Sequence, residues 1–348
     1  MIETRRRQYM FKKIAAIVAA GLLSLASLAS AETLINGAGA TFPYPLYSKW
    51  FNEYAKIDKS VKFNYQSIGS GGGIKQITAQ TVDFGASDKF LSDSELQGAP
   101  GKLIHIPTVM GAVVVTYNLP GVPTGVKLSS EDVADIFLGK ITKWNDPKIT
   151  NDNPGIKIPD KPIVVVHRSD GSGTTSIFTD YLTSVNQEWA KKVGKGPSVK
   201  WPVGLGGKGN EGVAGQIKNT QFSIGYVELA YAVENKLPYA FLKNKEGKFA
   251  EPTIKSISAA AAGAAKNMPA DYRISLVNQP GKDTYPVVGF TWLLVYEQQK
   301  DKVKGQKLVE FLNWSLHKGQ KLAAPLLYAP LPENVVKMVD KTIKTIKY

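Results

Sequence analysis

Three short segments combine glycine with serine or threonine, and each stands directly before a stretch with a helical pattern. Glycine lets a backbone approach a ligand closely, hydroxyl groups add donors, and a helix N-terminus offers unpaired N–H groups with a partial positive charge. Taken singly, each segment is also ordinary cap and turn chemistry. None is a Walker motif, because no Gly-Lys-Ser/Thr ends it. Together they predict an anion site built from Gly37–Pro43, Ser67–Gly73 and Arg168–Thr174.

Two charged residues sharpen this prediction. Arg168 closely follows the apolar run Ile163–Val166, where a strand end would fix its guanidinium for bidentate contact with an oxyanion. A surface ion pair with Asp170 is the alternative. Asp88 ends the segment Phe84–Asp88. A carboxylate beside an anion is repulsive unless the anion carries a proton to donate, which phosphate does near neutral pH and sulfate does not. Alone, an Asp after Ser is more often a helix cap.

The elements that must hold these residues alternate between strand-like and helix-like patterns, which is the signature of an α/β fold. Alternating or buried apolar runs predict strands, and amphipathic or capped runs predict helices. The helix at 130–138 is expected to be capped by Ser130 and stopped by Gly139. The stretch 145–162 indicates a surface excursion. Strands are expected over 61–66, 82–86, 162–166, 223–227 and 287–296, and helices over 44–54, from about 74, over 130–138, 175–189 and 304–317. Residues 104–115 form a long apolar stretch around Pro107 and Gly111.

The N-terminal residues 1–31 have the pattern of a secretory signal peptide. A basic start is followed by an uncharged, mainly apolar run and then by Ala29-Ser30-Ala31, a small-x-small cleavage site. We therefore expect cleavage after Ala31. A membrane anchor is the alternative. Arg5 to Arg7 leave open whether export uses the Sec or the twin-arginine route.

Composition restricts the possible partners. The chain has no cysteine, so an exported form would rest on its hydrophobic core without disulfides, and 348 residues make two lobes more probable than one. The net charge is +14, which is compatible with nucleic acid, an anionic surface or a small anion as the partner. Its lysines are scattered without a basic run or an interleaved aromatic stripe, which argues against nucleic acid as a ligand.

Six motifs in this order resemble the phosphate-binding proteins of high-affinity phosphate ABC transporters, and the resemblance covers nearly the whole chain after residue 31. The motifs are Gly37–Pro45, Ile68–Gly73, Val82–Asp88, Ile136–Asn145, Arg168–Thr174 and Gly204–Asn210.

The resemblance implies a role for each matching residue. It assigns the first donors to Thr41 and Phe42, a second group to Ser70, and a third to the run of Ser172, Gly173 and Thr174. Asp88 would accept the phosphate proton, and Arg168, oriented by Asp170, would supply the charged fork. Lys89-Phe90, His167 and Gly71 depart from the expected pattern, although none of them replaces a ligand donor.

The resemblance also implies an architecture and partners. We expect two α/β lobes of the type II periplasmic-binding-protein fold, with a hinge at 111–116 and 285–290. Lobe one would comprise residues 32–115 and 285–348, and lobe two residues 116–284. The expected protein is a periplasmic monomer without cofactor or metal that delivers phosphate to ABC transporter permease subunits with their ATPases.

Three other functions are compatible with the residues. A phosphate-ester hydrolase could use a serine of the glycine-rich loops, but such chemistry needs a base or a metal, and His105, His167 and His317 have no metal-site spacing. A site for another oxyanion, such as sulfate, molybdate or phosphonate, is the second alternative, against which Asp88 argues. A surface or adhesion role on the same scaffold is the third.

Overall fold

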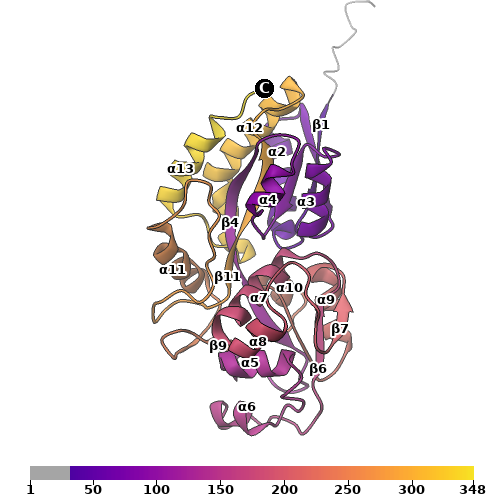
Figure 1. The fold of residues 1–348 in the computed structure, drawn as a ribbon, viewed down its shortest axis with the longest axis vertical. Coiled ribbons are helices and arrows are strands. Elements are labelled where there is room, and N and C mark those ends of the chain that lie inside the picture. The colour runs from indigo at the N-terminus through magenta and orange to yellow at the C-terminus, as the bar shows by residue number, and fades with distance from the viewer. Residues whose placement is uncertain (1–31) are drawn as a thin grey trace, which may run out of the picture.

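The computed structural model describes residues 32–348, so the predicted signal peptide lies outside the described residues. The chain forms an α/β fold, and the predicted class is confirmed. Two lobes lie end to end, with the long strand β4 and strand β11 running between them (Figure 1). None of the helices from residue 32 onward has the length and apolar character needed to cross a membrane.

The first lobe in Figure 1 contains the two ends of the described chain. Its strands are β1 (Thr33–Gly39), β2 (Val61–Ser67), β3 (Phe84–Ser87), the first part of β4 (Leu103–Tyr117) and β11 (Val288–Tyr296). Its helices are α2 (Tyr44–Ile57), α3 (Ser70–Thr78), α4 (Asp93–Gln97), α12 (Lys302–His317) and α13 (Glu333–Ile343), with two 3₁₀ turns at Gly319–Leu322 and Ala324–Leu326.

The second lobe holds the middle of the chain. Its strands are β5 (Lys127–Leu128), β6 (Val164–Arg168), β7 (Leu205–Gly207), β8 (Ser223–Glu228), β9 (Phe241–Lys243) and β10 (Phe249–Ala250). Its helices are α5 (Ser130–Phe137), α6 (Pro147–Asp152), α7 (Gly173–Val185), α8 (Gln187–Lys192), α9 (Gly209–Asn219) and α10 (Leu229–Glu234). Helix α11 (Ile254–Ala265) lies beside β4 and β11 (Figure 1).

One ladder of strands runs through both lobes in the order β2-β1-β3-β11-β4-β8-β6-β7. Strand β4 pairs antiparallel with β11 as far as Ala112, and from Val113 it pairs antiparallel with β8. The strands β1, β2 and β3 are parallel to one another, as are β6, β7 and β8. Each lobe therefore gathers the carboxyl ends of its parallel strands at one edge, where ligands of open α/β sheets bind.

Aromatic side chains pack between helices and strands in both lobes. In lobe one, the Phe63 ring lies 4.9 Å from Phe51 and 4.4 Å from Phe311, which joins β2 to α2 and α12. In lobe two, Phe178 of α7 stacks on Tyr226 of β8 with ring centroids 4.3 Å apart. All five rings are buried or partly buried. Pairs of this kind add roughly 0.5–1.5 kcal/mol beyond their area burial.

Most of the predicted elements are present, but two helix starts differ from the prediction. The second helix begins at Ser70 rather than near Ile74, because Gly69 takes the N-cap at φ +84° and Ser70 already belongs to the first turn. The helix at 130 is capped by Ser129, not Ser130. The Ser129 side chain accepts from the Asp132 amide, and Asp132 reaches back to the Ser129 amide, which forms a capping box.

The predicted helix over 175–189 is two helices instead. Ser172 caps α7, which begins at Gly173, and Asn186 adopts an extended conformation that ends it. The Asn186 side chain then accepts from the Trp189 amide and starts α8. Asparagine competes locally with the helix in this way, since its side chain bonds the backbone two or three residues on. The predicted excursion at 145–162 contains the short helix α6.

Candidate functional site

The three predicted loops meet at the facing edges of the two lobes. In lobe one, Gly39, Ser67 and Ala86 lie side by side at the ends of β1, β2 and β3. In lobe two, Arg168 pairs with Gly207 at the ends of β6 and β7. The helices α2, α3, α7 and α9 all begin at these edges, so their N-termini face one region. The structure therefore brings together residues from distant parts of the chain.

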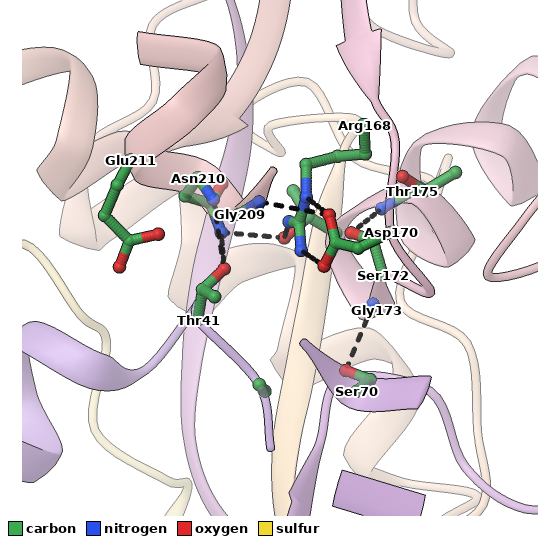
Figure 2. A network of polar contacts seen from close by, with 12 residues as sticks. Thr41, Ser70, Arg168, Asp170, Ser172, Gly173, Thr175, Gly209, Asn210 and Glu211 are labelled. Carbon is green, nitrogen blue, oxygen red and sulfur yellow. Dashed lines mark hydrogen bonds and ion pairs between the residues drawn. The ribbon is translucent and has the colours of Figure 1, made fainter. Parts of the chain in front are cut away.

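Direct contacts between the loops hold the two lobes together. The Gly71 amide donates to the Gly171 carbonyl at 2.8 Å. The Gly173 amide donates to Ser70 Oγ at 3.1 Å (Figure 2). A side chain at Gly173 would overlap Ser70 Oγ and Asp88 Oδ2, so only glycine permits this approach. The structure is thus the closed arrangement of the two lobes.

Arg168 is the buried cation of the site. Its residue exposure is 3%, and its Nε and Nη2 donate to the two carboxylate oxygens of Asp170 at 2.7 and 2.6 Å (Figure 2). Its backbone amide donates to Tyr226 Oη at 3.2 Å, which ties the strand end to the aromatic core. The alternative predicted from the sequence was a surface ion pair between Arg168 and Asp170. This ion pair is present, but it is buried. It leaves Arg168 Nη1 free to face Thr174 Oγ1, at 3.4 Å.

Asp170 is held as a carboxylate. It also accepts from the Gly209 amide at the start of α9, at 3.0 Å. Burial alone would raise the pKa of Asp170, but the hydrogen bonds and the charge of Arg168 outweigh it and lower that pKa below its ordinary value. A charged Asp170 fixes the plane of the Arg168 guanidinium through its two contacts with Nε and Nη2.

Unpaired backbone amides line the same region. Among the described residues, no acceptor is found for the amides of Thr41, Phe42, Ser70 and Thr174, which stand at the entrances to α2, α3 and α7. Ser172 is different, since its Oγ caps α7 by accepting from the Thr175 amide at 3.0 Å. The Gly173 amide donates to Ser70 Oγ in the closed arrangement.

Asp88 is a buried acceptor within this set of donors. Its Oδ1 accepts from Thr291 Oγ1 at 2.8 Å, and Ser70 Oγ lies 3.4 Å from Oδ2. Asp88 does not cap a helix, because α4 begins at Asp93 and is capped by Ser92. Burial raises the pKa of Asp88 to about 7, against the opposing effects of the Thr291 hydrogen bond, the Arg168 charge and Ser70.

The three departures from the family pattern leave the site intact. Lys89 forms an ion pair with Glu95 at 2.5 Å, and Phe90 packs edge-on against Trp292. His167 stacks on Trp201, with ring centroids 4.8 Å apart. Gly71 supplies the amide that contacts the opposite lobe. No charge is therefore added to the region around Arg168 and Asp88 by these departures.

Several contact residues were not assigned a role from the sequence. Thr291 lies in the middle of β11, where nothing in its surroundings marks it. Asn210 could have been found, because the motif Gly204–Asn210 has the same pattern of glycines before a helix as the other three loops. Its amide group contacts Thr41 Oγ1 at 2.7 Å and Thr174 Oγ1 at 3.1 Å. Within residues 32–348, no three His, Cys, Asp or Glu side chains cluster to hold a metal ion.

Comparisons with known proteins agree with this geometry. The PBP superfamily domain matches residues 26–318. "Phosphate-binding protein PstS" of Pasteurella multocida is 46% identical over 331 residues, covering 95% of each chain. The protein of the same name from Haemophilus influenzae is 44% identical over 326 residues, covering 93% of this chain and 97% of its own.

Solved structures share the fold. A periplasmic phosphate-binding protein (PfluDING) bound with phosphate superposes with a TM-score of 0.71 at 23% identity, covering 88% of this chain and 93% of its own. A putative phosphate ABC transporter substrate-binding protein from Clostridium perfringens gives a TM-score of 0.63 at 18% identity, covering 86% of this chain and all of its own. The predicted two-lobed fold is confirmed by these likenesses.

Proposed function

The chain belongs to the PBP superfamily and, within it, to the family of the phosphate-binding proteins PstS, and from this premise we propose that it captures inorganic phosphate between its lobes and delivers it to an ABC transporter permease. One observation carries the proposal. A buried guanidinium and the unpaired amides of three helix entrances face one carboxylate, Asp88. Such a site suits an anion that is both charged and protonated.

We assign the ligand contacts as the sequence predicted them. Thr41 and Phe42 contribute from α2, Ser70 from α3, and Ser172, Gly173 and Thr174 from α7, while Arg168 supplies the charge and Asp88 accepts the phosphate proton. Support comes from the meeting of these residues at one place, and from their burial at 3% exposure or less for each named side chain. Equilibrium dialysis with radiolabelled phosphate should show saturable uptake of about one ion per chain.

The lobes must open for the ligand to enter, since these donors are buried in the closed arrangement. We keep the lobe limits predicted from the sequence, with crossings at 111–116 and 285–290. In their favour, β4 changes its partner strand after Ala112 and β11 begins at Val288. A ligand that contacts both lobes shifts the population toward the closed state.

Small-angle scattering should therefore give a smaller radius of gyration with saturating phosphate than without it. Sulfate at the same concentration is the control and should leave the radius unchanged. An equal radius with and without phosphate would contradict lobe closure, while leaving the claim of phosphate binding open to the dialysis experiment.

We infer that this site binds without catalysis. A serine nucleophile is usually activated by an adjacent histidine base. His167 is stacked on Trp201, and His105 Nε2 accepts from the Leu91 amide, so neither histidine contacts Ser70. Burial also lowers the pKa of His105 to about 4. The Ser70 hydroxyl oxygen instead accepts from the amides of Asp88 and Gly173, which suits a fixed ligand donor.

The compartment and partners follow from the family and the N-terminus. We propose export to the periplasm with cleavage after Ala31, and function as a monomer that docks on the permease subunits of a phosphate transporter and their ATPases. N-terminal sequencing of the secreted protein would test the cleavage site.

Sulfate exclusion should depend on pH. Because the pKa of Asp88 is raised to about 7, this group is charged above that pH and takes up a proton below it. A neutral, protonated Asp88 can donate to sulfate, so sulfate binding should strengthen as the pH falls from 8.5 to 5.5. The expected gain is about tenfold for each pH unit of the fall toward the pKa, and it levels off below about pH 7, where Asp88 is already protonated. Titrations with Asp88→Asn should lack this dependence, and a wild-type sulfate affinity that is flat with pH would contradict the role of Asp88.

A further inference from the structure

Asn210 lies between the two lobes at the start of α9 and is fully buried. Its Oδ1 accepts from the Glu228 amide at 2.9 Å. This bond fixes the orientation of the side-chain amide, because a backbone N–H can only donate. Nδ2 must therefore point the opposite way, toward the site (Figure 2).

The Asn210 Nδ2 group contacts one threonine hydroxyl from each lobe. It donates to Thr41 Oγ1 of lobe one at 2.7 Å and to Thr174 Oγ1 of lobe two at 3.1 Å. The Asn210 backbone amide adds a second bond to Thr41 Oγ1 at 3.2 Å, and Arg168 Nη1 approaches Thr174 Oγ1 at 3.4 Å. Each hydroxyl oxygen thus faces two N–H donors.

This arrangement determines what the two hydroxyls can still do. A hydroxyl has two lone pairs and one proton. The lone pairs of the Thr41 and Thr174 hydroxyl oxygens face N–H donors, so each hydroxyl has only its proton left for a further hydrogen bond. Among the described residues, neither proton has an acceptor. Both hydroxyls are then obliged to donate to a bound anion.

We propose that Asn210 is a positioning residue that sets the hydroxyl protons of Thr41 and Thr174 toward the anion, and that it reaches Thr41 only when the lobes are closed. The inference rests on the proposed function and extends it. Donor orientation and closure become linked, because the same NH₂ group bonds a hydroxyl from each lobe. An anion in the closed site meets hydroxyl protons already aimed at it, without a further reorganisation cost.

The variant N210D tests this idea with little change of shape. The carboxylate introduced at position 210 would accept hydrogen bonds where the Asn210 amide donates them, so the two threonine protons would turn toward it and away from the anion. The substitution would also add a negative charge beside the anion. We expect phosphate affinity at pH 8 to fall about 100-fold, the order of two lost hydrogen bonds to a charged ligand. The ratio of wild-type to variant affinity should shrink at least about tenfold by pH 5, since the protonated carboxyl can donate again.

A second set of variants separates positioning from simple support of the fold. N210A should weaken phosphate binding strongly in the wild-type background but much less in T41V/T174V, where the hydroxyls that it orients are missing. N219D, the same chemical change at the exposed far end of α9, is the matched control and should bind as the wild type does. Melting curves of each variant report on folding.

An equal loss for N210A in both backgrounds, or an N210D deficit that is the same at pH 8 and pH 5, would overturn the positioning role. Wild-type affinity in N210D would also overturn it. These results leave the proposed function standing, because the wild-type protein binds phosphate in each of them. A wild-type protein that binds no phosphate would instead overturn the proposed function and this inference with it.

Discussion

Replacing Arg168 with alanine should weaken phosphate binding by about a thousandfold or more. Charge-assisted hydrogen bonds contribute roughly 1.5–3 kcal/mol each, and Arg168 offers a fork of them from a position that is 3% exposed. The change also leaves Asp170 without its ion-pair partner next to the anion, which adds repulsion. Calorimetric titration with phosphate measures the effect.

Two further variants make this result interpretable. R168K should recover only part of the affinity, because a point charge cannot form the planar fork. R273A removes a guanidinium that pairs with Asp93 and Asp271 on the surface, and it should bind phosphate normally. If R168A binds phosphate within about threefold of the wild type, the assignment of the site is wrong.

Asp88→Asn should change which anion the protein accepts. An ionised Asp88 can only accept a hydrogen bond, so it meets sulfate lone pair to lone pair, with two negative charges in a buried pocket. We expect the wild type to favour phosphate over sulfate by about three powers of ten or more. In D88N the neutral amide can turn its NH₂ toward either anion, so sulfate binding should become measurable while much of the phosphate affinity remains.

The control for this change is D93N, because Asp93 lies five residues on and its side chain is 77% exposed. It should leave the ratio of phosphate to sulfate affinity unaltered. A D88N protein with the wild-type ratio and only a lower melting temperature would show that Asp88 acts through stability. The contacts of Asp88 with Thr291 and Ser70 make the discrimination of ligands the expected outcome.

The sequence predicts the meeting of the three loops better than it predicts the element boundaries. The three loops could be identified because glycine and hydroxyl residues before a helix have a local physical meaning, and because Arg168 follows a buried apolar run. Ser70 and Asn186 show the limit. Whether a serine precedes a helix or begins it depends on the φ angle of Gly69, and whether a helix continues past Asn186 depends on a local side-chain bond.

Contacts between distant segments were the least predictable part. Thr291 supports Asp88 across 203 positions of the chain, and its own strand gives no sign of it. Asn210 is 169 positions from Thr41, so its bridging position follows only from closure of the two lobes. These contacts depend on the strand order and on the fit of the lobes, which local patterns do not encode.

The central claim, that the protein binds phosphate with discrimination against sulfate, is tested most directly by one calorimetric experiment. Residues 32–348 at pH 8 would be titrated first with sulfate and then with phosphate in the same cell. We predict no measurable heat of binding for sulfate and a saturating signal near one phosphate per chain. Equal affinity for the two anions, or no signal with phosphate, would contradict the account.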